Sequence, residues 1–324
     1  MRLRSCLRRS ANRALLVIVL SSVASCSDSP NPIAPDPDPA LPLTIACPQD
    51  VEATLTEGTD LPLSFGPPTI AGGDAPVTVS CGPASGSMFS PGTSRVTCTA
   101  VDSGGRQASC SFGVTVTRAP RLAVTTFLAF GDSVTEGKLS LSVNLLIDSP
   151  AHSYPAALGR ALMDRYPSQT FSVLNAGFGG ERVAASGDRF TAALREHRPG
   201  AVLLLHGIND LNGDGLPGVQ QAVDGLEELV KSAVASGTPT FVATLPPLGP
   251  GPKAFCPECV IPFNDRVHHM VPAKGAVLVD VFAAWGGRSG LMGADGIHPT
   301  EAGYETIATA FFEAIGATLE TIQP

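Results

Sequence analysis

A β-prone apolar run leads directly into glycines and polar residues in TTFLAFGDSVTEG, residues 125–137. The run at 125–130 is short and almost wholly apolar, as expected of a buried strand in a parallel sheet. Ser133 follows it at once. Because open α/β sheets bind ligands outside the carboxyl ends of their strands, the stretch predicts a strand and, beside it, a place for chemistry.

Strand and helix patterns alternate from here to the C-terminus. Further β-prone runs cover 171–175, 201–205, 240–245 and 276–281, and helical patterns cover 154–166, 188–197, 219–236, 262–271 and 300–319. Such alternation predicts an α/β domain with a parallel sheet and helices on both faces. We place this domain at residues 122–324.

Three more blocks carry polar groups that fit acyl transfer: NAGFGG at 175–180, GIND at 207–210 and DGIHP at 295–299. A serine nucleophile needs a base, a carboxylate that orients the base, and donors for the oxyanion. The spacing of Asp295 and His298 would let one turn orient the imidazole, which could then accept the Ser133 proton. The Gly180 N–H, the Asn209 amide and the Ser133 N–H are candidate oxyanion donors.

Each of these signals alone has an ordinary structural interpretation. Ser133 could be a helix N-cap, and the Asp295–His298 turn could lie on the surface. A phosphate-binding loop at Gly137-Lys138 is excluded by its spacing and by the two acidic residues beside it. The Gly-x-Ser-x-Gly elbow of α/β-hydrolases is absent at Ser133.

Together, the four blocks resemble the GDSL lipases of the SGNH hydrolase superfamily over 122–324. The signature residues of that superfamily fall on Ser133, Gly180, Asn209 and His298, and Asp295 completes the triad. Valine follows Ser133 where the family name has leucine. The resemblance implies a flavodoxin-like three-layer α/β/α sandwich and ester hydrolysis through an acyl-enzyme, without metal or cofactor.

Residues 43–118 differ from this pattern, because short β-prone runs alternate there with Gly, Pro, Ser and Asp turns. This predicts a small all-β domain, and four cysteines in it indicate two disulfides with three possible pairings: Cys47, Cys81, Cys98 and Cys110. The segment resembles a hyalin repeat, an immunoglobulin-like module. The resemblance implies the pairs Cys47–Cys110 and Cys81–Cys98. Nothing in the segment looks catalytic, so we expect a spacer or adhesion role with glycan or protein contact.

Two other features have more than one interpretation. Cys256 and Cys259 could bind zinc or act in redox chemistry, but no second pair has this spacing, so a local disulfide is expected. They lie in a proline-rich stretch at 246–262, which should emerge on the same side as Ser133. His206 precedes the third block, and it could line the pocket or pack at a strand end.

The N-terminus predicts export and lipid anchoring. Residues 1–25 combine five arginines, a short apolar run and Val-Ala-Ser before Cys26, which resembles a bacterial lipoprotein signal with Cys26 as the lipidated residue. The proline-rich tether at 26–42 follows. Removing the signal leaves 16 of the 21 basic residues against 29 acidic ones, a net charge of about −13, so nucleic acid is not an expected partner.

We therefore expect an extracytoplasmic serine esterase, a lipoprotein at the outer membrane or cell surface. Its expected substrates are short-acyl esters, chiefly acetyl esters on polysaccharides. The alternatives are a lysophospholipase or short-chain lipid esterase, and a surface adhesion protein whose hydrolase fold is catalytically dead.

Overall fold

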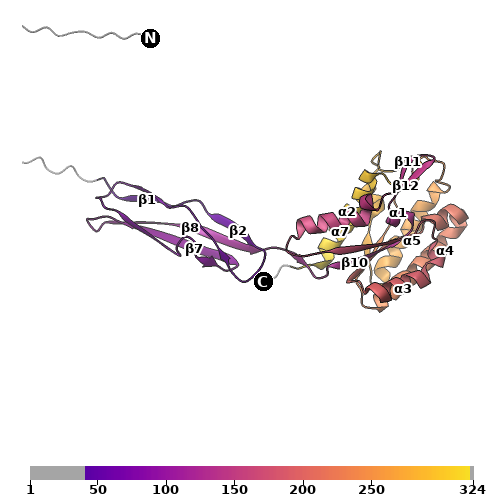
Figure 1. The fold of residues 1–324 in the computed structure, drawn as a ribbon, viewed down its shortest axis with the longest axis horizontal. Coiled ribbons are helices and arrows are strands. Elements are labelled where there is room, and N and C mark those ends of the chain that lie inside the picture. Colours follow the sequence, from indigo (N-terminus) through magenta and orange to yellow (C-terminus); the bar gives the residue numbers. More distant parts are fainter. Residues whose placement is uncertain (1–40, 322–324) are drawn as a thin grey trace, which may run out of the picture.

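The computed structural model describes residues 41–321 of the 324-residue chain. Figure 1 shows an all-β part followed, along the longest axis of the molecule, by a sheet with helices around it. The expected signal peptide, Cys26 and most of the tether lie outside the described residues. Between residues 41 and 321, no helix combines the length and the apolar character that a bilayer span needs.

The all-β part is built on a four-stranded sheet in the order β2-β8-β7-β5. Along β7, the buried side chains of Val96, Cys98 and Ala100 alternate with more exposed ones, as in a strand with one face on a core. Two short antiparallel pairs, β1–β4 and β3–β6, complete this part. The strands are β1 Thr44–Ala46, β2 Val51–Leu55, β3 Leu61–Pro62, β4 Thr69–Ala71, β5 Thr78–Gly82, β6 Met88–Phe89, β7 Gly92–Val101 and β8 Gln107–Arg118.

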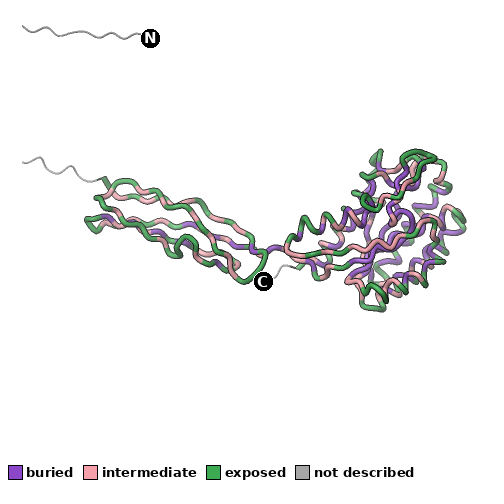
Figure 2. The backbone as a smooth tube through the Cα atoms, viewed as in Figure 1, coloured by how far each residue is buried: buried purple, intermediate pink, exposed green. Residues whose placement is uncertain are grey.

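Two disulfides crosslink this part. Cys47 bonds to Cys110 on β8, and Cys81 on β5 bonds to Cys98 on β7. These are the pairs that the hyalin-repeat resemblance implied. Figure 2 shows that buried residues are sparse here, whereas they fill the interior of the second part. A domain with so small a core depends on such crosslinks for stability.

Five parallel strands form the sheet of the second part, in the order β13-β10-β14-β15-β16. The first of these strands in the chain thus lies between the second and the third, which is the 2-1-3-4-5 order of flavodoxin-like folds. The expected fold class is therefore confirmed. The strands are β10 Thr126–Gly131, β13 Ser172–Gly177, β14 Ala201–Leu205, β15 Thr240–Ala243 and β16 Val277–Val279.

Helices cover both faces of the sheet (Figure 1). On one face α2 Tyr154–Arg165 packs against α7 Glu301–Leu319, and on the other α4 Ile208–Ala235 packs against α3 Gly187–His197 and α5 Val260–Ala273. Residues 127–130 and 201–205 are at most 2% exposed. The two central strands are apolar throughout because both of their faces are covered.

The second part differs from the sequence prediction in two places. The helical segment α4 begins at Ile208 and not at 219, and it consists of two helices joined across a kink at Gly215 (φ 63°). Asn209 therefore lies in the first turn of a helix and not in a loop. A hairpin of β11 Lys138–Ser142 and β12 Leu145–Asp148, which the sequence reasoning missed, follows the short helix α1 Ser133–Glu136.

The two ends of the second part lie side by side. β9 Arg121–Leu122 pairs antiparallel with β17 Glu320–Thr321. Both lie beyond the amino end of β10, whereas Ser133 follows the carboxyl end of that strand. The chain therefore enters and leaves this part at the edge of the sheet opposite Ser133.

Candidate active site

Ser133 is the first residue of α1, directly after β10. The Asp132 side chain caps this helix, because its Oδ1 accepts a hydrogen bond from the Val134 N–H at 3.0 Å. The turn is tight against the neighbouring strand, since a Cβ on Gly131 would lie 2.0 Å from the carbonyl oxygen of Leu205. Only glycine fits there, and the Ser133 side chain is held in place, 6% exposed.

His298 and Asp295 lie in one turn before α7. Asp295 is fully buried, and its Oδ1 accepts hydrogen bonds from the N–H groups of Ile297 and His298, both at 3.1 Å. Its Oδ2 lies 2.7 Å from His298 Nδ1, and His298 Nε2 lies 2.8 Å from Ser133 Oγ. The three side chains thus form a continuous hydrogen-bonded chain that leads from carboxylate to hydroxyl.

The charge of Asp295 is stabilised by these contacts. Burial raises the pKa of Asp295, but hydrogen bonds from the His298 ring and from the two backbone N–H groups outweigh burial, so the pKa lies below its usual value. An ionised Asp295 holds the proton of the imidazole on Nδ1 and leaves Nε2 free to accept one.

The candidate oxyanion donors line the same cavity. This cavity of about 370 Å³ is bordered by Ser133, Gly180, Asn209 and His298. Gly180 has a φ of 79° and open space where a Cβ would be, so its backbone conformation and not crowding favours glycine. The Asn209 Nδ2 donates to the carbonyl oxygen of Glu181 at 2.9 Å, which fixes the amide and leaves its second N–H.

Sequence reasoning missed other residues of the cavity. Lys253 lines it, and its Nζ lies 3.3 Å from Asp295 Oδ2. Leu146 from the β11–β12 hairpin and Phe178 after β13 also line it, and they are 37% and 60% exposed. The polar and apolar alternation at 138–142 could have predicted the hairpin, whereas no pattern marked Lys253.

The structure decides between the alternatives that the sequence leaves open for His206 and for the Cys256–Cys259 pair. His206 is fully buried and does not line the cavity. Cys256 and Cys259 form a disulfide in the stretch that also carries Lys253. Within residues 41–321, no three His, Cys, Asp or Glu side chains are grouped so that they could hold a metal ion.

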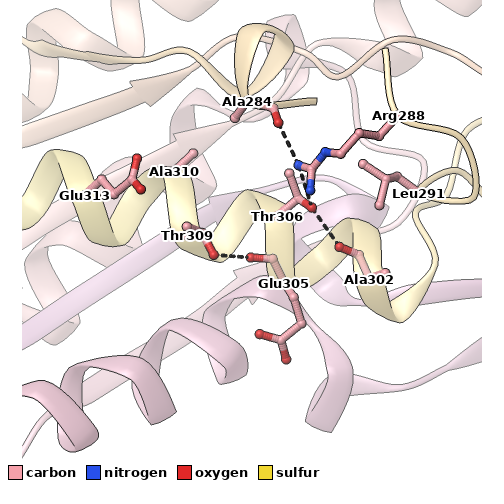
Figure 3. A pocket seen from close by; sticks show the side chains of 9 residues that line it. All are labelled: Ala284, Arg288, Leu291, Ala302, Glu305, Thr306, Thr309, Ala310 and Glu313. Atoms are coloured by element: carbon pink, nitrogen blue, oxygen red, sulfur yellow. Dashed lines mark hydrogen bonds between the residues drawn. The ribbon is translucent and has the colours of Figure 1, made fainter. Parts of the chain in front are cut away.

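A larger cavity, of about 600 Å³, lies elsewhere, against α7 (Figure 3). Arg288 donates hydrogen bonds there to the Ala284 carbonyl at 2.7 Å and to Thr306 Oγ1 at 3.3 Å. The side chains drawn include two threonines and two glutamates but no histidine, serine or cysteine. Both threonine hydroxyls donate to backbone carbonyls at 2.8 Å, Thr306 to Ala302 and Thr309 to Glu305, so neither is paired with a base as an acyl-transfer nucleophile must be.

Comparisons with known proteins identify a family for each part of the chain. The GDSL-like lipase/acylhydrolase family matches residues 129–306, and the HYR domain matches residues 37–116. A search of curated proteins gave no match.

Two solved structures share the fold of the second part. The lipase/acylhydrolase from Enterococcus faecalis is 20% identical, with a TM-score of 0.52 over 62% of this chain and 99% of that one. Est24, a carbohydrate acetylesterase from Sinorhizobium meliloti, is 16% identical, with a TM-score of 0.52 over 60% of this chain and 99% of that one. The family match covers more than half of the chain, and the chain belongs to the GDSL-like lipase/acylhydrolase family of ester hydrolases, with a HYR domain before its α/β part.

Proposed function

We propose that Ser133 is the nucleophile of this ester hydrolase, with His298 as its base and Asp295 as the orienting carboxylate. The observation that carries the proposal is the chain from Asp295 Oδ2 through the imidazole to Ser133 Oγ, with contacts of 2.7 and 2.8 Å. Ser133 Oγ attacks the ester carbonyl carbon while His298 Nε2 takes the hydroxyl proton. The N–H groups of Ser133, Gly180 and Asn209 stabilise the oxyanion.

The tetrahedral intermediate then collapses to an acyl-enzyme. His298 gives its proton to the departing alcohol, so the C–O bond of the ester breaks and the acyl group stays on Ser133. Water enters, His298 takes a proton from it, and the second tetrahedral intermediate releases the acid and regenerates Ser133. The buried Asp295 stabilises the imidazolium that forms in each half of the cycle.

For the substrate, we propose short-acyl esters, chiefly acetyl esters on polysaccharides. A cavity of about 370 Å³ fits a small acyl group with part of its alcohol. Both polar and apolar side chains line this cavity, and the charged ones are Glu136, Lys138 and Lys253. Polar side chains of this kind can bond sugar hydroxyls. Est24, which shares the fold, is a carbohydrate acetylesterase.

A lysophospholipid or short-chain lipid ester is the second candidate. Phe178 and Leu146 present apolar surface at the cavity, and Phe178 is 60% exposed. Such surface would contact an acyl chain that extends beyond the cavity.

Turnover of p-nitrophenyl acetate by the purified protein tests esterase activity first. A panel of acetylated glycans, lysophospholipids and p-nitrophenyl esters of rising chain length, scored by released acid, then separates the two substrate classes. We expect kcat/KM to be highest for acetyl esters and acetylated glycans. A maximum at long acyl chains would replace the glycan proposal with the lipid one.

We also propose that the enzyme works outside the cytoplasm as a lipoprotein of the outer membrane or cell surface. Cys26 follows a signal-like segment, and the HYR domain has two disulfides, which persist in oxidising compartments. The HYR domain would serve as a spacer or as a contact for glycan or protein.

A further inference from the structure

His206 occupies an unusual position directly behind the candidate oxyanion hole. It follows β14 and is fully buried, with its ring between two carboxylates. Its Nδ1 lies 3.4 Å from Asp132 Oδ2, and its Nε2 lies 3.4 Å from Glu181 Oε2. The side chains of Asp132 and Glu181 are 1% and 9% exposed. Neither Asp132 Oδ2 nor His206 Nε2 has a hydrogen-bond partner among the described residues.

The two flanking carboxylates favour a protonated, positively charged ring. A neutral imidazole has one N–H and can serve one of them, whereas an imidazolium has an N–H for each. The Gly207 N–H also lies 3.0 Å from Nδ1, which would suit a neutral ring. That contact joins adjacent residues, and a neutral ring would leave Asp132 Oδ2 buried without a cation. Burial lowers the pKa of His206, but the two carboxylates together raise it to about 9.

The two carboxylates belong to the segments that carry the proposed catalytic groups. Asp132 precedes Ser133 and caps its helix, so Oδ2 is the oxygen left to face His206. Glu181 follows Gly180, and its carbonyl oxygen accepts the Asn209 Nδ2 at 2.9 Å. The His206 ring thus contacts the residue before Ser133 and the residue after Gly180. The second of these, Glu181, also accepts the hydrogen bond from Asn209.

Arg189 completes the cluster from α3. Its Nε donates to Glu181 Oε1 at 2.8 Å, and its Nη2 donates to the Gly131 carbonyl at 3.1 Å. The contacts of Glu181 with His206 and Arg189 outweigh burial and lower its pKa to about 2. Asp210 on α4 is the remaining acid near the ring; burial raises its pKa, and the charge of His206 opposes that rise. A protonated His206 would therefore complete an alternation of charge that runs from Arg189 through Glu181 and the ring to Asp132.

We propose that His206 is a positioning residue whose buried imidazolium holds the Ser133 and Gly180 turns at the separation that the oxyanion needs. The inference rests on the proposed roles of Ser133, Gly180 and Asn209. Loss of the His206 proton would leave two buried carboxylates facing a ring that can serve only one of them, so the turns would shift. A shift of about 1 Å at such a site can lower the rate on the order of 10²-fold.

The pH dependence follows from the sign of the shift. The pKa of His206 is raised in the folded protein, from 6.5 to about 9. Its contribution to stability is therefore full below pH 6.5 and is lost as the pH rises through 9. We expect kcat to fall as the pH rises through about 9, while KM changes little.

The test combines an NMR titration with kinetics of the full chain. In ¹⁵N-labelled protein, with His206 assigned by comparison with His206→Gln, we expect both ring nitrogens to be protonated at pH 7 and to titrate near pH 9. A neutral His206 ring at pH 7 overturns the proposal. Because this titration needs no turnover, its result is independent of whether Ser133 is the nucleophile.

Kinetics then separate positioning from a purely structural role. His206→Gln should lower kcat roughly 10- to 100-fold at pH 7 with little change in KM, and it should lack the alkaline limb near pH 9. His268→Gln is the matched control, because His268 pairs with Asp280 on a partly exposed surface; its pH profile should equal that of the unmodified protein. An unchanged alkaline limb in folded His206→Gln protein would assign that limb to another group and refute the proposal.

Discussion

Ser133 Oγ is hydrogen-bonded to a buried histidine, His298, that the buried Asp295 orients. Ser149 Oγ also lies 2.7 Å from a histidine nitrogen, Nδ1 of His152, but that pair is exposed. We expect Ser133→Ala to abolish both ester hydrolysis and labelling by an organofluorophosphonate. Thr135 cannot replace it, because Thr135 is fully buried and its Oγ1 donates to the Leu205 carbonyl at 3.2 Å. Esterase assay and mass spectrometry of the labelled protein measure the result. Labelling that persists in Ser133→Ala would place the nucleophile at another residue.

Asn209 should act mainly on the transition state. Asn209→Ala should lower kcat by about 10²–10³ with little change in KM, since an oxyanion donor bonds most strongly to the charge that develops. Asn209→Asp keeps the size of the side chain but removes its N–H donors, so its kcat should fall by a similar factor. Steady-state kinetics on p-nitrophenyl acetate provide the comparison. An effect confined to KM would instead make Asn209 a substrate-binding residue.

Asp295 should matter for turnover and for acid stability. Asp295→Asn should lower kcat on the order of 10⁴-fold, because an amide favours the wrong His298 tautomer. The pKa of Asp295 is lowered in the folded state, so its contribution to stability is present above pH 3.8 and is lost as the pH falls further. Thermal unfolding of both proteins between pH 6 and pH 3 should show their Tm difference shrinking. A difference that stays constant with pH would contradict a lowered pKa.

The stretch at 246–262 links a disulfide to the cavity through Lys253. The ring that Cys256–Cys259 closes is small, so it contributes less to stability than a long crosslinked loop would. We expect Cys256→Ala/Cys259→Ala to change Tm by only a few degrees and to alter the kcat/KM ratio between acetyl and butyryl esters. Cys81→Ala/Cys98→Ala, in the HYR domain, should leave that ratio unchanged. A large drop in Tm with an unchanged ratio would make the stretch purely structural.

Strands and helices of the α/β part were largely predictable, because strands buried on both faces are recognisable as continuous apolar runs. The helical turns from Ile208 were missed because Gly213, Gly215 and Pro217 favour a loop on local grounds. Gly215 does kink the segment, but Ile208 and Leu211 before it are helical and buried in the core. Gly180 and Asn209 were identified through the family resemblance, since glycine and asparagine are ordinary loop residues. The carboxylates around His206 come from separate segments, so only the fold reveals them.

Attachment of the whole molecule to a membrane is expected to depend on Cys26. If the expected signal is removed, about 13 more acidic than basic residues remain, so the net charge would not attract the protein to anionic lipid. Cys26→Ser should therefore release the protein into the soluble fraction or leave its precursor uncleaved, while esterase activity of the folded protein persists. Fractionation and mass spectrometry of the N-terminus measure this. Correctly cleaved Cys26→Ser protein that stays on the membrane would disprove the lipid anchor.

The pairing of β9 with β17 determines which way the enzyme faces. Both the HYR domain and the C-terminal end join the α/β part at the amino edge of its sheet, and Ser133 lies at the opposite edge. In Figure 1 α4 lies farthest from the HYR strands, and α1, β11 and β12 lie in the same half of the α/β part, away from those strands. If Cys26 is embedded in a bilayer, the HYR domain comes between that anchor and the α/β part along the chain, and Ser133 lies at the edge of the sheet away from the HYR domain. The enzyme would then attack material that approaches from its surroundings, and the lipids that hold it would be beyond its reach.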